Sequence, residues 1–170
     1  MLIRIDGEPI DDIYALTADD GPLGDGPLLV TYTRALQDHA DLVGRPWPFG
    51  VRIPNTVLCD QIAFSLNDAA LLAIDFPTFA DGRGFSLGRR LRLAGFAGTL
   101  RAVGPLIPDQ IRHCRRVGFN EISIPNEVAR RHSVADWRVA SAIISGAYQD
   151  GYGGDTILER RRIEREKARA

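Results

Sequence analysis

The chain has 170 residues, two cysteines and a net charge of −1 at neutral pH. That length suits one domain and is too short for two ordinary ones. Hydrophobic residues at 45% and charged residues at 25% are globular values, which exclude a disordered or membrane-spanning chain. The N-terminus turns acidic at once and lacks the basic-then-apolar layout of a signal peptide, so we expect a cytoplasmic protein.

In chain order, residues 1–10 predict a small hairpin that turns at Asp6-Gly7, and residues 17–27 form a loop rich in Gly, Pro and Asp. Strand patterns then start near residues 28, 51, 70, 99 and 121. Helical patterns follow them at residues 34–42, near 56–66, at 86–94, from Pro108 and from Ser133.

This alternation of strand and helix is typical of βα units around a mainly parallel sheet. We therefore expect an α/β fold of about five such units in one domain spanning residues 1–155, as an open sheet or an incomplete TIM-like barrel. A complete barrel takes about 250 residues. Residues 156–170 predict a charged, solvated C-terminal helix. An incomplete barrel leaves a sheet edge exposed, so we also expect a homodimer.

Cys59 and Cys114 are the two cysteines, and they form no CxxC pair. An iron–sulfur cluster normally takes four thiolates, so the chain cannot hold one alone. The three histidines, His39, His113 and His132, are equally scattered. We expect no metal site and no cofactor.

The net charge is near zero although the charged residues are unevenly distributed along the chain. Residues 1–82 carry thirteen acids and four bases, whereas residues 83–116 carry eight arginines and one acid. The basic stretch could meet an anion, an acidic partner or the acidic first third of the same chain. Nucleic acid is not expected, because the net charge is near zero and few aromatics interleave the arginines.

The loop that follows the strand ending near Asp75 contains most of the candidate binding residues. Ligands bind beyond the carboxyl ends of parallel strands, and Gly82, Arg83, Gly84 and Ser86 could cradle an anion there. The same residues also fit a tight turn in which Asp81 caps backbone and Ser86 caps the helix. The run is neither a P-loop nor a dinucleotide fingerprint.

Arg101 lies inside the next strand, where an arginine needs a partner. Asp75 and Asp81 are the candidates. Asp109 and Gln110 open the helix after that strand, so all of these residues are predicted to gather at one sheet edge. Such a polar cluster fits an active site and a structural ion-pair network equally well.

Four stretches together resemble one bacterial family of unknown function: Phe76-Pro77-x-Phe79-x-Asp81-Gly82-Arg83-Gly84-Phe85-Ser86, Leu100-Arg101-Ala102-Val103-Gly104, Asp109-Gln110 and Arg116-x-Gly118-Phe119. The resemblance is dense over residues 70–120. Members of that family lie beside assimilatory sulfite reductase genes and are often labelled probable oxidoreductases involved in sulfite reduction. The sequence shows no flavin, nicotinamide, haem or cluster motif that would support the oxidoreductase label.

Two functional hypotheses follow from the resemblance and the residues. The first is an accessory protein of sulfite reduction, not redox-active alone, which binds an oxyanion or docks on sulfite reductase through its arginine-rich edge. Arg83, with Gly82, Gly84, Ser86, Gln110 and Asp75 around it, would form the binding site. The second is a small enzyme of the same pathway with Asp81 or Asp109 as acid or base and Arg101 as electrophilic stabiliser.

Overall fold

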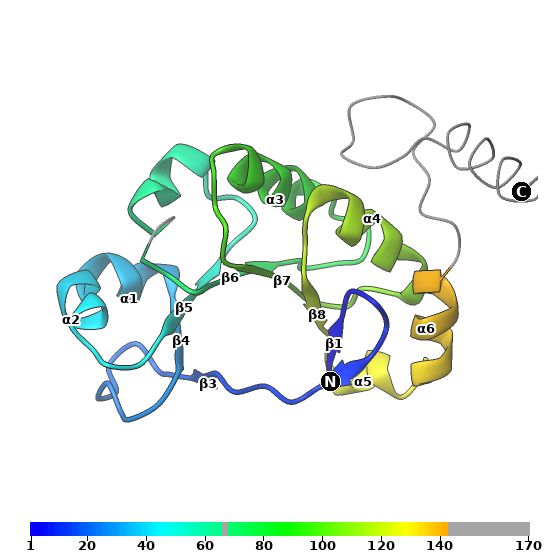
Figure 1. Ribbon diagram of the computed structural model, residues 1–170, viewed down its shortest axis with the longest axis horizontal. Coiled ribbons are helices and arrows are strands. Elements are labelled where there is room, and N and C mark those ends of the chain that lie inside the picture. The colour runs from blue at the N-terminus through cyan, green and yellow to red at the C-terminus, as the bar shows by residue number, and fades with distance from the viewer. Residues whose placement is uncertain (66–67, 143–170) are drawn as a thin grey trace, which may run out of the picture.

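A curled sheet dominates the protein. The structure is a computed structural model and describes residues 1–65 and 68–142. Eight strands pair in the order β2-β1-β8-β7-β6-β5-β4-β3. The run from β3 to β8 is parallel, and β1 pairs antiparallel with β8 and β2. Figure 1 shows the strands as an arc with helices on its convex side, which makes the fold a half-barrel.

The elements have short connections. The strands are β1 (Leu2–Arg4), β2 (Pro9–Ile10), β3 (Ala15–Leu16), β4 (Leu28–Thr31), β5 (Phe49–Ile53), β6 (Leu71–Asp75), β7 (Thr99–Val103) and β8 (Glu121–Ser123). The α-helices are α1 (Tyr32–Gln37), α2 (His39–Val43), α3 (Arg83–Leu93), α4 (Ile111–Val117), α5 (Asn126–Ala129) and α6 (Val134–Ala142), and the 3₁₀ helices are η1 (Cys59–Ser65) and η2 (Pro108–Gln110).

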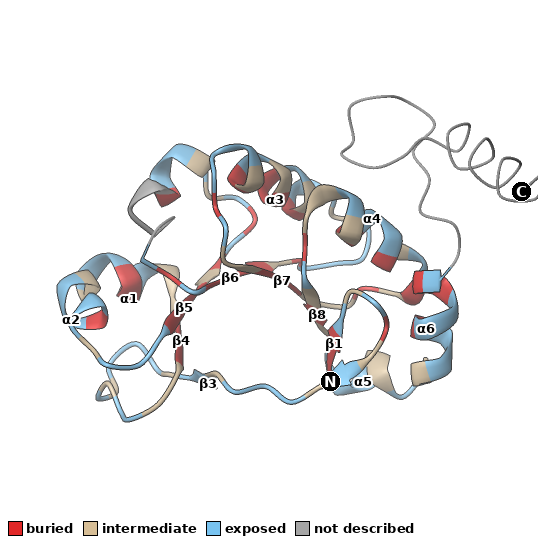
Figure 2. Ribbon diagram, viewed as in Figure 1, coloured by how far each residue is buried: buried red, intermediate tan, exposed pale blue. Residues whose placement is uncertain are grey.

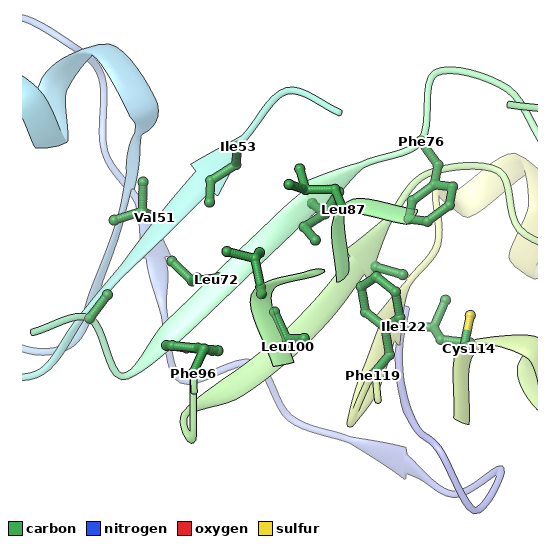
Figure 3. Close-up of a cluster of buried hydrophobic side chains, with 14 of the residues drawn as sticks. Val51, Ile53, Leu72, Phe76, Leu87, Phe96, Leu100, Cys114, Phe119 and Ile122 are labelled. Atoms are coloured by element: carbon green, nitrogen blue, oxygen red, sulfur yellow. The ribbon is translucent and has the colours of Figure 1, made fainter. Parts of the chain in front are cut away.

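The main core lies between the convex face of the sheet and the helices, as Figure 3 shows. Alternate strand residues such as Val51, Leu72 and Leu100 point into it and are fully buried. Phe76, Phe85 and Phe119 add tilted and edge-on ring contacts. Burial therefore follows the inner side of the helix layer, while the outer helix faces are exposed (Figure 2).

The predicted α/β domain with a mostly parallel sheet is confirmed. The five expected strands are present as β4 to β8, but the sheet has eight strands because the first sixteen residues add β1, β2 and β3. The connection between β5 and β6 is a 3₁₀ helix, so the exact count of five βα units is not confirmed. The expected charged helix at 156–170 lies outside the described residues.

Two of the expected helices have different bounds. The helix expected at residues 34–42 is divided into α1 and α2 at Asp38. The helix expected at Ser86 begins three residues earlier, at Arg83. None of the helices that the structure describes is long and apolar enough to cross a membrane.

Residues 11–14, which we call the strap, join β2 to β3 across the concave side of the sheet (Figure 1). The Asp12 carboxylate accepts two hydrogen bonds from Arg101 of β7, at 2.7 and 2.9 Å. The Tyr14 ring packs on a small apolar cluster of Leu29, Leu71 and Ala73. The strap is therefore anchored to the inner face of the half-barrel at two points.

Candidate functional site

An ion pair joins two neighbouring strands at the carboxyl edge of the sheet. Nε of Arg52, near the end of β5, donates to Oδ1 of Asp75, the last residue of β6, at 2.8 Å. The Arg52 side chain is 38% exposed and that of Asp75 is 28% exposed. Nη1 and Nη2 of Arg52 have no hydrogen-bond partner among the residues described by the structure, so they present their donors to solvent.

Two cavities open beside this pair, and Arg52 and Asp75 line both of them. The first has a volume of about 660 Å³ and the second about 490 Å³. Parallel α/β sheets bind ligands beyond the carboxyl ends of their strands, which is where these cavities lie. The remaining walls of the first cavity are Leu16, Thr17, Ala18, Asp19, Thr31, Tyr32, Thr33 and Pro54; those of the second are Phe76, Pro77, Val103, Gly104, Ser123, Ile124 and Pro125.

The two cavities differ in charge. The first contains the carboxylate of Asp19, which accepts a 2.5 Å hydrogen bond from the Thr31 hydroxyl. The second has mainly apolar walls, with the Ser123 hydroxyl as a polar group in addition to the ion pair. An anion would be repelled by Asp19 in the first cavity, so the second cavity is the better environment for negative charge beside Arg52.

A buried arginine that the sequence analysis did not single out shapes the first cavity. Arg34 of α1 is 5% exposed and donates to the carbonyl oxygens of Ala18 and Gly21. Its Nε also donates to the carboxylate of Asp38, four residues later at the C-terminal end of α1. Arg34 thereby fixes the loop that forms the outer wall of the first cavity.

Sequence reasoning also missed Arg52, although its signal was present. Val51-Arg52-Ile53 places an arginine inside a strand, which is the same pattern that singled out Arg101. The sheet register does not distinguish the two arginines, because Arg52 and Arg101 both lie opposite Ala73, two residues before Asp75. The Arg101 guanidinium is occupied by Asp12 and Glu121, which leaves Asp75 to Arg52.

The partners predicted for Arg101 are wrong. Its guanidinium binds Asp12 of the strap and Glu121 of β8, the latter at 2.7 Å. Glu121 is the register neighbour of Arg101, so its carboxylate is the nearest one across the sheet. At 3% exposure Arg101 has no surface open to a ligand, and the ion pairs account for its presence in the strand.

The loop before α3 is organised by its own residues. The Asp81 carboxylate accepts from the Arg83 backbone N–H at 3.1 Å, and it also pairs with the Arg83 guanidinium at 2.6 Å. The Arg83 side chain, the Asn55 side chain and the Arg83 N–H together hold the pKa of Asp81 well below its usual range. These are the contacts of a tight turn capped by Asp81, and neither residue lines the two cavities.

The other loop residues have local roles as well. A Cβ on Gly84 would lie 2.5 Å from the Phe76 ring, so this glycine lets the start of α3 pack on that ring. A Cβ on Gly82 would meet nothing within 4 Å. Ser86 is exposed within the first turn of α3 and does not cap it, because the helix begins at Arg83 with Gly82 as its N-cap.

Asp109 and Gln110 lie in different surroundings. Nε2 of Gln110 donates to the Phe79 carbonyl at 2.8 Å and so ties η2 to the loop before α3. Asp109 lines a separate cavity of about 330 Å³ beside His132 and Asp136. The structure therefore does not bring Asp109 together with Arg101 or Asp75 as the sequence analysis expected.

The described residues include no group of three His, Cys, Asp or Glu side chains arranged to hold a metal ion. Both cysteines are free thiols, with Cys59 half-buried and Cys114 fully buried. Burial raises the pKa of Cys114 to about 12, and burial together with nearby Asp60 raises the pKa of Cys59 by less.

We expect one thiol per native chain to react with Ellman's reagent at mildly alkaline pH, and a second only after unfolding. Cys59 is reachable by the reagent, whereas Cys114 is both inaccessible and protonated. Time-resolved absorbance of the released thiolate measures this. The Cys59→Ser variant should show no fast phase; two fast thiols in the native protein would contradict the burial of Cys114.

Comparison with known proteins assigns the chain to a family by its sequence. A family model described as "Bacterial protein of unknown function (DUF934)" matches residues 50–157, which is more than half of the chain and includes Arg52, Asp75 and Ser123. No curated protein and no solved structure matches the chain significantly. The matched region covers β6 to β8 and the carboxyl-edge residues, and the chain therefore belongs to this bacterial family of unknown function, DUF934.

Proposed function

We propose that this protein is an accessory protein of sulfite reduction that binds a small oxyanion at the carboxyl edge of its half-barrel, in the cavity between Arg52 and Ser123. The observation that carries the proposal is the position of Arg52, whose guanidinium lines a cavity of about 490 Å³ while its terminal nitrogens have no partner among the described residues. A guanidinium with unused donors is the side chain best suited to a planar or tetrahedral oxyanion.

The geometry of the Arg52–Asp75 pair supports binding without loss of the pair. Asp75 uses only Nε of Arg52, so the two terminal nitrogens remain for a ligand oxygen. The pair also fixes the direction of the guanidinium, which lowers the conformational entropy that binding would otherwise cost. The Ser123 hydroxyl, from the end of β8, supplies a further donor in the same cavity.

The pathway assignment is supported by the sequence resemblance over residues 70–120, since the similar proteins lie beside assimilatory sulfite reductase genes. Sulfite and sulfate are small, highly charged oxyanions, so they match the proposed site in charge and in hydrogen-bond chemistry. The arginine that we propose as ligand is Arg52. Arg83 is held by Asp81, and Arg101 by Asp12 and Glu121.

We expect Arg52→Gln to weaken oxyanion binding at least tenfold, because glutamine keeps some hydrogen bonding but removes the charge. Isothermal titration calorimetry with sulfite, sulfate and phosphate measures the change. Arg130→Gln is the matched control, since Arg130 is an exposed arginine after α5 and lines neither cavity. The Arg130→Gln variant should bind the oxyanions with the same affinity as the unchanged protein.

Two further variants sharpen this test. Asp75→Asn should raise the affinity several-fold, because it removes a negative charge that lines the cavity and competes for Arg52. Asp19→Asn should have little effect if the anion occupies the second cavity. Absence of heat with all three oxyanions, or equal heat from the unchanged protein and Arg52→Gln, would refute the proposal.

A further inference from the structure

The outer surface over α3 and α4 is strongly basic. These two neighbouring helices contain seven arginines and no aspartate or glutamate. Ion pairs with the acidic first half of the chain, residues 1–82, could have neutralised this charge. Arg83 and Arg101 bind carboxylates of residues 1–82, whereas Arg89, Arg90, Arg92, Arg115 and Arg116 have no ion pair with the residues that the structure describes.

Two further arginines of these helices hold backbone rather than acids. Arg92 donates to the carbonyl oxygens of Phe96, Gly98 and Gly118, and Arg115 to those of Ile5 and Ser141. Carbonyl contacts fix these side chains but leave their charge uncompensated. They therefore add to the positive potential of the surface.

The remaining arginines point away from the core. Arg89, Arg90, Arg112 and Arg116 form what we call the α3–α4 arginine face; Arg89 is half-buried and the others are exposed. No ion pair or hydrogen bond links Arg89, Arg90 or Arg116 to the residues that the structure describes. Figure 2 shows the outer side of α3 and α4 uncovered by any described element.

Arg89 and Arg116 lie along the seam between the two helices. Two side chains of α3 contact the α4 segment. The ring centroids of Phe85 and His113 are 4.2 Å apart, and Nε of Arg92 donates to the Gly118 carbonyl oxygen at 2.9 Å. Arg89 lies one turn after Phe85 and nearly one before Arg92, so it faces the same seam. On α4, Arg116 follows His113 by three residues, and burial together with the Arg116 charge lowers the pKa of His113.

We infer that the α3–α4 arginine face is a docking surface for an acidic patch on a partner protein. The inference is independent of the oxyanion site, because none of the cavities described above is lined by these arginines. The outer face of α3 and α4 is therefore separate from the cavities that would enclose a small anion. It does fit an extended row of carboxylates, each of which can take an arginine fork.

The chemistry favours protein over nucleic acid. The whole chain has a net charge of −1, so its long-range field does not attract a polyanion such as RNA. Among phenylalanine, tyrosine and tryptophan, the two helices contain Phe85 alone, which is half-buried against the His113 ring, so they present no row of exposed rings on which bases could stack. The large exposed hydrophobic residue there is Leu93. A local positive face on a neutral protein is typical of docking between oppositely charged protein surfaces.

The test uses the full chain and a fluorescent peptide of alternating glutamate and aspartate, with a single-stranded RNA of equal charge as the competing class. We expect the peptide to bind in low salt and to be released in high salt. The Arg89→Glu/Arg116→Glu variant should bind it at least tenfold more weakly, as fluorescence anisotropy measures. Amide hydrogen exchange should show protection at residues 83–93 and 111–117.

The matched control is Arg130→Glu/Arg131→Glu, which makes the same charge change at two exposed arginines outside these helices. It should keep the peptide affinity within about twofold. Equal weakening by both double variants would show a general charge effect and overturn the inference. Tighter binding of the RNA, or protection at Arg52 and Ser123 in place of the two helices, would overturn it too.

Discussion

Gly104→Ala is expected to lower the free energy of unfolding by about 3 kcal/mol or more. Gly104 has a φ of +149°, and a Cβ there would lie 2.1 Å from the Phe76 carbonyl oxygen. That oxygen belongs to the backbone at the end of β6, whose amide donates to Val103, so it cannot move aside without breaking the ladder. Urea unfolding followed by circular dichroism measures the loss.

Gly82→Ala is the matched control for this substitution. Its Cβ would meet nothing within 4 Å and its φ of −77° suits any residue, so the stability should fall by about 1 kcal/mol or less, the ordinary cost of an alanine at a helix N-cap. Equal stability of the two variants would mean that β6 and β7 are not as close at Gly104 as described. Since Gly104 also lines the proposed oxyanion cavity, a folded variant with lost binding is the further readout at this position.

Arg101→Met should cost about 3 kcal/mol of stability. The substitution leaves Glu121, which is 12% exposed, without its cation, and it releases the strap at Asp12. We place the loss at the lower end of the range for broken buried pairs because the Asp12 side chain is 39% exposed and can turn to water. Thermal and urea unfolding give the value.

A double variant separates lost charge pairing from lost packing. Arg101→Met/Glu121→Leu should recover most of the stability, because no buried charge is then left unpaired. Arg138→Gln serves as the control: its pair with Glu8 also ties the N-terminal segment to a distant element, but both side chains are exposed, so little change is expected. A stable Arg101→Met protein with lost oxyanion binding would instead assign Arg101 to the site.

The loop before α3, which resembles an anion cradle in sequence, has a structural role. Asp81, Arg83 and Gly84 lie close together in the sequence because they build one turn and pack it on Phe76. Gln110, from a separate stretch, joins that turn to η2. A turn before a helix and an anion cradle need the same residue types, since both use glycine, a short acid and an arginine. The contacts observed here are those of the turn.

The cavities, by contrast, are formed by residues far apart in sequence. Arg52, Asp75 and Ser123 come from β5, β6 and β8; Arg52 and Asp75 are the single charged residues of two apolar strands, and Ser123 ends the short strand β8. Such isolated residues carry no spacing that a motif could reveal. The arginine inside Val51-Arg52-Ile53 was the available signal, and its partner depended on β5 and β6 being neighbours in the sheet and on other carboxylates binding Arg101.

By itself the sequence determined the class of fold and the five parallel strands, because these depend on hydrophobic periodicity, which is local. It also determined the concentration of arginine in residues 83–116. Only the tertiary structure decided which charges meet. The strap brings Asp12 to Arg101 across 89 residues, and Asp75 at the end of β6 meets Arg52 of the neighbouring strand β5, because ion pairs depend on three-dimensional proximity that no local pattern encodes.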